Sequence, residues 1–137
     1  MHLKNVSALV LLFVAACGGP LSYTPKTSAR APGTEVEVVA DVKGDQHSTT
    51  LDVKMKHLPP PGAIQEGSKV FVVWQRKGSD GQWTRVGGLA YKEGDREGKL
   101  EKASVPETAF ELMVTAEVTA DGASPSPHVV VEQKVNK

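Results

Sequence analysis

The chain has 137 residues, with 16 basic and 16 acidic side chains, 39% hydrophobic residues and a single cysteine. This length fits one domain with its own core and excludes two-domain enzymes. The balanced charge gives no electrostatic reason to expect nucleic acid as a partner. One cysteine cannot form an internal disulfide or a thiolate zinc site.

Residues 1–16 have the pattern of an export signal. Lys4 precedes an apolar run from Val6 to Ala16. The run matches the roughly 7–15 residues of a signal-peptide core and is shorter than the roughly 20 residues of a membrane-spanning helix. The stretch VAAC that ends at Cys17 resembles the bacterial lipobox. The resemblance implies that diacylglycerol alkylates the Cys17 thiol and that the leader is then removed.

Lipidation would make the bilayer the first partner of this chain, through acylated Cys17. The alternative is that Cys17 is merely an apolar residue of the leader. Two or three acyl chains, as the resemblance implies, anchor a protein firmly. Gly18 stands where an Asp would signal inner-membrane retention. We therefore expect a cell-envelope lipoprotein, with the outer membrane favoured over the inner.

Residues 17–33 are rich in Pro, Gly, Ser and Thr and show neither helical nor strand periodicity. This composition is typical of a flexible linker. We therefore expect a tether over 17–33 that holds the domain, residues 34–137, away from the bilayer.

Apolar and polar residues alternate through most of the remaining sequence, which predicts strands. Turn signals such as Asp80-Gly81 and Asp121-Gly122 separate the strands, and Gly87-Gly88 predicts a bulge. Short strands at this spacing indicate an all-β, two-layer antiparallel sandwich of immunoglobulin-like type. Trp74 lies on the third strand, where such sandwiches often bury a Trp, and is expected in the core. The expected strands cover 36–42, 51–55, 69–75, 83–91, 99–104, 110–118 and 129–135.

Two long segments between residues 69 and 135 also resemble a known family. They read KVFVVWQRKGSDGQWTRVGGL and FELMVTAEVTADGASPSPHVVVEQKV, and they are similar to the extracytoplasmic domain of anti-sigma-K factors. The family's domain follows a transmembrane helix and a sigma-binding segment, and we find neither in this sequence. The resemblance therefore implies the sandwich fold and argues against a regulatory role.

No catalytic motif rises above background in this sequence. His47, His57 and His128 lie far apart and form no metal-ligand spacing. Asp95 and Glu97 share a charged loop but lack the further acidic ligands of a calcium site. We expect no enzyme activity, no metal and no cofactor. A hydrolase would need a buried cluster of His and carboxylates that the sequence does not reveal.

Two segments are candidates for binding. Trp83, with Arg85 two residues later and Tyr91 near the end of the same predicted strand, could stack on a sugar ring or anchor a protein. The alternative is that Trp83 packs over the edge of the sandwich. The proline run within 57–62 is stiff enough for recognition but is more often a rigid connection.

The sequence thus favours a non-enzymatic envelope lipoprotein that presents a binding or structural module to an envelope protein. The alternative is a carbohydrate- or peptidoglycan-binding module using Trp83 and Tyr91.

Overall fold

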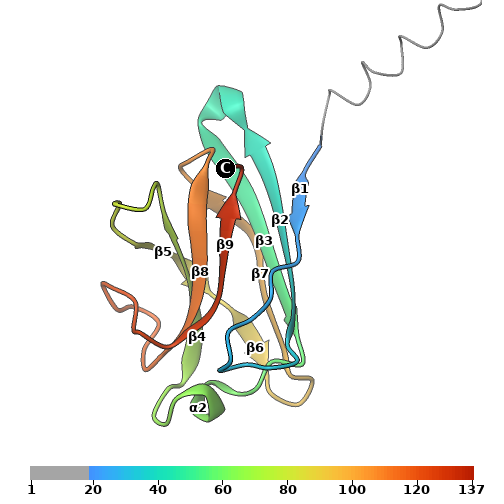
Figure 1. Cartoon of the computed structure of the whole chain (residues 1–137), viewed down its shortest axis with the longest axis vertical. Helices are drawn as coiled ribbons and strands as arrows, with labels where there is room; N and C mark the ends of the chain where they lie inside the picture. The colour runs from blue at the N-terminus through green and yellow to red at the C-terminus, as the bar shows by residue number, and fades with distance from the viewer. Residues whose placement is uncertain (1–18) are drawn as a thin grey trace, which may run out of the picture.

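A computed structural model describes residues 19–137 as a two-layer antiparallel β-sandwich (Figure 1). One layer has five strands in the order β1-β2-β3-β7-β6, and the other has four in the order β5-β4-β8-β9. A short 3-10 turn, η2 (Gly44–Gln46), joins β2 to β3, and a single helical turn, α2 (Pro61–Ile64), precedes β4. The strands are β1 (Leu21–Tyr23), β2 (Glu35–Lys43), β3 (Ser48–Lys56), β4 (Val70–Arg76), β5 (Thr84–Gly88), β6 (Ala90–Lys92), β7 (Glu97–Val105), β8 (Phe110–Glu117) and β9 (Val129–Val135).

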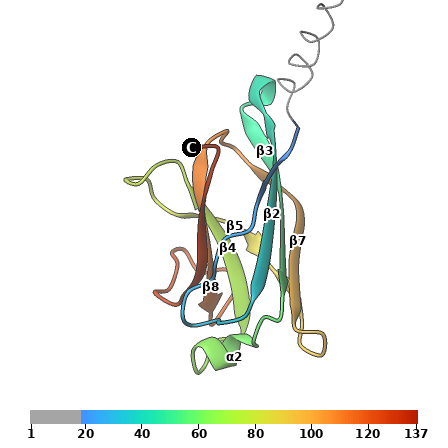
Figure 2. The same ribbon diagram turned by 45° about the vertical axis from the view of Figure 1, so that its right-hand side comes forward.

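The strand order confirms the predicted all-β, immunoglobulin-like sandwich. Strands β2, β3, β7 and β6 face β5, β4, β8 and β9, which is the arrangement of an immunoglobulin domain with β1 added beside it. Figure 2 shows the two layers, with β2 and β7 in one and β4 and β8 in the other. Six of the seven expected strands correspond to single strands of the sandwich, and β1 was not expected.

The expected strand 83–91 divides between the two sheets. Leu89 turns inward, only 8% exposed, and its N–H donates to the Phe71 carbonyl at 3.0 Å. The predicted bulge is also present, because Arg85 and Gly87 pair with adjacent residues of β4. A Cβ on Gly87 would lie 3.2 Å from a methyl group of Leu100, so the bulge brings backbone and side chain unusually close. The chain therefore passes from one sheet to the other at Leu89, whose side chain is buried between β5 and β6.

Alternation on each strand supplies the core between the sheets. The inward residues of both layers are almost fully shielded from water. Burying each large side chain of this kind contributes roughly 1.5–3 kcal/mol. The largest members are Phe71, Phe110, Leu51, Met55, Leu58 and Leu112.

The predicted tether over 17–33 is wrong for its described part, because that part belongs to the sandwich. Leu21 and Tyr23 pair with Ala40 and Val38 of β2. The chain then crosses to the other layer, where the Ser28 N–H donates to the Val130 carbonyl at 2.8 Å. The segment thus spans the gap between β2 and β9.

Side chains within this segment hold it in place. The Ser28 hydroxyl donates to the Val129 carbonyl at 2.7 Å, the Thr27 hydroxyl donates to the Ala31 carbonyl at 2.6 Å, and Ala31 is fully buried. Two of the Ser and Thr residues that suggested a linker therefore donate hydrogen bonds, Thr27 within the segment and Ser28 to β9. Cys17 and the predicted leader lie outside the described residues.

Candidate functional site

Trp83 lies on the outer face of the four-stranded sheet, where it packs against Val72, Trp74 and Met113. The Arg76 guanidinium carbon sits 4.4 Å from the centre of the Trp83 ring. A cation in this position occupies a face of the indole and contributes about 0.5–2 kcal/mol. Trp83 therefore covers a second apolar cluster, which is the packing alternative that the sequence left open.

Tyr91 lies elsewhere, in the core between the sheets. Its ring meets Phe71 edge to face, with 5.4 Å between the ring centres, and its hydroxyl donates to the Leu58 carbonyl at 2.6 Å. Burial raises the pKa of the Tyr91 phenol above its ordinary value. Arg85 is exposed on β5. The structure thus does not bring Trp83 and Tyr91 onto one surface, as stacking on a sugar would require.

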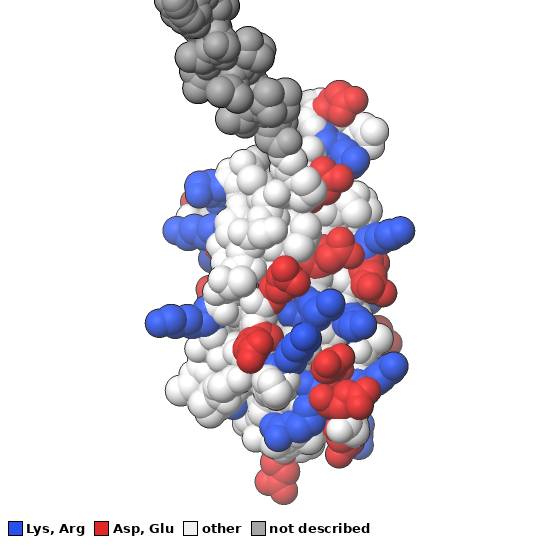
Figure 3. Space-filling model, turned by 90° about the vertical axis from the view of Figure 1, so that its right-hand side faces the viewer, with Lys and Arg blue, Asp and Glu red and all other residues white. Residues whose placement is uncertain are grey.

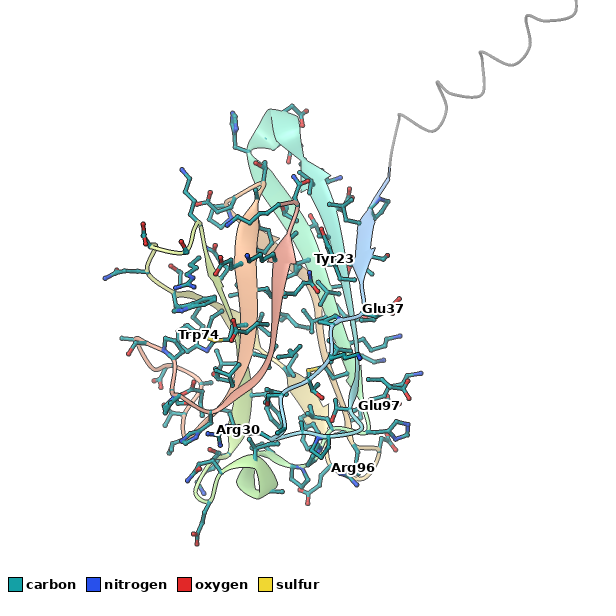
Figure 4. All side chains as sticks on the ribbon, in the orientation of Figure 1. Tyr23, Arg30, Glu37, Trp74, Arg96 and Glu97 are labelled. Carbon is teal, nitrogen blue, oxygen red and sulfur yellow. The ribbon has the colours of Figure 1, made fainter. Side chains whose placement is uncertain are left out.

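Trp74 is buried as predicted, with 1% of its surface exposed, but it faces the opposite way from the interior Trp of an immunoglobulin domain. Phe71 and Val73 point between the sheets, so Val72 and Trp74 point outward by the two-residue period of the strand. Figure 4 places Trp74 on the side of the four-stranded sheet away from β2. The expectation that it fills the central core is therefore wrong in direction.

A chain of hydrogen bonds holds this second cluster together. The Trp74 indole N–H donates to the Thr115 hydroxyl at 2.9 Å, and that hydroxyl donates in turn to the Glu117 carboxylate. The same carboxylate accepts the Ser126 N–H at 2.8 Å. Glu117 thereby ties the 118–128 loop to β8 beside the buried Trp. Sequence reasoning missed this role because nothing local links Trp74, Thr115 and Ser126.

A hollow of about 280 Å³ lies beside this network, at the end of the sandwich that carries α2. His128 contributes to its wall, and the Nδ1 atom of His128 is buried with no hydrogen-bond partner among residues 19–137. Val118, at 59% exposure, also borders the hollow and is the one large apolar side chain exposed within that range. The remaining lining residues are Gln65, Glu66, Ser68, Ala116, Glu117, Thr119 and Ser126.

Two polar side chains of the hollow already make hydrogen bonds within the chain. The Ser126 hydroxyl already donates to the Ala116 carbonyl at 2.8 Å, and the Glu117 carboxylate accepts two internal hydrogen bonds. A serine nucleophile needs a free hydroxyl aligned with a base. The arrangement instead offers a polar lining that includes Glu117, and the exposed Val118 side chain, to a visiting group.

The outer face of the five-stranded sheet is different in character. Acidic and basic side chains are interspersed over it (Figure 3). Glu37 stands directly opposite Lys54, and Glu35 opposite Lys56, on neighbouring strands. Shallow hollows of about 500 Å³ and 230 Å³ lie along this charged surface. Opposite charges in register neutralise each other locally, so the face presents no single-sign patch.

The three histidines do not converge. His47 follows η2 at one end of β3, whereas His57 follows the other end and lies 3.7 Å from the Glu35 carboxylate. His128 precedes β9. Among the described residues, no group of three or more His, Cys, Asp or Glu is placed to hold a metal ion. The proline run forms the start of α2 and packs Pro61 and Ile64 inward, so it is a connection within the fold.

Cys17 remains a sequence-based prediction, since it precedes the described range. Within residues 19–137, no helix is long and apolar enough to cross a membrane.

No protein family, curated protein or solved structure matches this chain. The likeness to the anti-sigma-K domain therefore stays a resemblance, and a shared sandwich fold does not establish a shared function.

Proposed function

We propose that this protein is a lipid-anchored component of the bacterial cell envelope whose sandwich is a non-catalytic binding or structural module. The observation that carries the proposal is the start of the fold at Leu21, directly after the lipobox-like residues that end at Cys17. Cleavage before Cys17 would leave a mature protein that is almost entirely sandwich. The acylated Cys17 would be the anchor, and the sandwich that begins at Leu21 would be the part held at the membrane.

The polar groups of the fold support a non-catalytic role. The Tyr91 hydroxyl, the Ser126 hydroxyl and the Thr115 hydroxyl each donate to an acceptor within the chain. Hydroxyls whose protons are donated within the chain in this way contribute to the stability of the fold. The glycan-binding alternative has less support, because Trp83 and Tyr91 belong to separate clusters.

We place the partner surface at the hollow beside Val118. An exposed apolar side chain beside a polar-lined hollow is a combination that an envelope protein could cover. The charged outer face of the five-stranded sheet offers only solvated, self-neutralised pairs.

The anchoring half is tested by growing cells with a clickable palmitate analogue. We expect the native chain to incorporate label and to partition into detergent, and the Cys17→Ala variant to take up no label and to remain uncleaved or soluble. Gly19→Ala is the matched control, since an added Cβ there meets nothing within 4 Å. Membrane recovery of Cys17→Ala at the native level, without label on the native chain, would overturn the proposal.

The binding half is tested by photo-crosslinking in intact cells. A photoreactive residue at Val118 should give a discrete adduct, and the same residue at Lys54 should not. Equal adducts from both positions would remove the case for the hollow.

A further inference from the structure

The amino end of the described chain leaves the sandwich at one particular end. Leu21 is opposite Ala40, and β2 continues to Lys43 before turning through η2. Residues that precede Leu21 therefore emerge beside the β2–β3 turn. The C-terminus lies at the same end of the molecule (Figures 1 and 2). We call this the proximal end, formed by η2, His47, residues 106–109, Asn136 and Lys137.

Hydrogen bonds make the proximal end a single rigid surface. The Thr49 hydroxyl donates to the Glu107 carbonyl at 2.6 Å. The Asn136 N–H donates to the Tyr23 hydroxyl, and the Asn136 side-chain amide donates to the Thr108 carbonyl, both at 2.8 Å. Strand β1, the β7–β8 turn and the C-terminus are thus joined. The position of β1 therefore fixes the position of the other segments at this end.

The chain between anchor and sandwich is very short. Three residues, Gly18, Gly19 and Pro20, separate Cys17 from Leu21, so the two Cα atoms are at most about 15 Å apart. Pro20 further restricts this span, because its ring fixes one backbone dihedral. By comparison, the nine residues of β2 extend over roughly 30 Å. The connection through residues 18–20 is therefore shorter than the sandwich measured along β2.

We propose that the proximal end of the sandwich rests against the head groups of the bilayer that anchors Cys17, while α2 and the Val118 hollow point away from it. This inference rests on the proposed lipid anchor. Asp45, Gln46 and His47 at the tip of the turn are exposed and polar, and Lys43 is paired with Asp41 at 3.1 Å. The chemistry suits contact with a polar head-group layer and excludes insertion into the hydrocarbon.

The proposal is tested with the acylated full-length protein in phosphatidylethanolamine–phosphatidylglycerol vesicles containing nitroxide-head-group lipids. Acylation consumes Cys17, so an introduced cysteine is the single free thiol and carries a fluorophore. Q46C reports on the proximal end, and D95C, on the exposed β6–β7 turn, is the matched control at the other end. We expect several-fold stronger quenching at position 46 than at position 95.

A variant with a longer spacer isolates the role of the short connection. Twelve Gly and Ser residues inserted after Gly19 add a coil of about 20 Å, which should bring quenching at position 46 down towards that at position 95. Equal quenching at both positions with the native spacer, or stronger quenching at position 95, would overturn the proposed orientation. Failure of acylation is a separate result: the protein would stay in the aqueous phase and Cys17 would itself react with the fluorophore.

Discussion

The outer faces of the two sheets differ: one is charged and solvated, and the other is apolar and largely buried. On the five-stranded sheet, outward positions hold charged side chains such as Glu37 and Lys54, and water covers them. On the four-stranded sheet, outward positions hold Val72, Trp74 and Met113, which the fold itself covers with Trp83 and with the loop tied down by Glu117. Alternation along a strand thus predicts an inner and an outer face. Whether the outer face of a sheet is solvated or buried depends on the residues outside the strands that pack on it, such as Trp83.

The largest expected difference comes from removing the aromatic side chain of the buried outer face. Trp74→Ala should lower the free energy of unfolding by about 3–5 kcal/mol, because it leaves a cavity and removes the indole donor to the Thr115 hydroxyl. Urea denaturation followed by circular dichroism measures this. Lys54→Ala, on the other outer face, should change stability by less than about 0.5 kcal/mol. An unchanged melting temperature for Trp74→Ala would mean that the outer cluster is not packed.

A smaller effect is expected from the hydrogen bond beneath that cluster. Thr115→Val preserves shape but leaves the buried indole N–H without its acceptor, which should cost about 1–3 kcal/mol. Thr50→Val is the matched control, since Thr50 occupies an outward position of β3 where water can replace its bonds. Equal destabilisation of the two variants would show that the network contributes nothing beyond strand propensity.

Acid should weaken an ion pair on the outer face of the four-stranded sheet. The hydrogen bond from Arg76, at 2.8 Å from the Glu111 carboxylate, lowers the pKa of Glu111 below its ordinary 4.5. A depressed folded-state pKa means that Glu111 stabilises the fold above about pH 4.5, and that this contribution is lost as the pH falls through the lower folded value. The urea midpoint of Glu111→Gln should therefore fall less between pH 6 and pH 3 than that of the native protein.

The smallest effect is expected on the charged face. Glu37→Lys places a second cation directly opposite Lys54, which should cost about 0.2–1 kcal/mol. Added salt should recover most of the loss, because both groups are solvated. A loss that persists in high salt would indicate that this face is less exposed than the structure has it.

Local patterns predicted most of the fold. Alternation and apolar runs located β2, β3, β4, β7, β8 and β9, and Gly87-Gly88 marked the bulge, because strand period and glycine geometry are properties of a few consecutive residues. Local patterns gave a wrong prediction for the segment around Ser28, which was expected to be a flexible linker. Its composition is that of a linker, and its order comes from bonds to β9 more than a hundred positions away, since Ser28 and Val129 are 101 residues apart.

The candidate sites show the same division. Proximity in sequence suggested that Trp83 and Tyr91 could act together, yet Leu89 turns the chain from one sheet to the other between them. The hollow beside Val118 could not be foreseen, because its wall joins residues near α2 to both ends of the 118–128 loop.

The sequence by itself determined the all-β class and most strand positions, because each depends on residues that are neighbours in the chain, and it predicts lipidation at Cys17 on the same kind of local pattern. Only the tertiary structure decided which way Trp74 faces, where the domain begins, and from which end of the sandwich the amino end of the described chain emerges. Those properties depend on long-range contacts, such as Ser28 with β9 and Tyr23 with Asn136, whose partners no local pattern specifies.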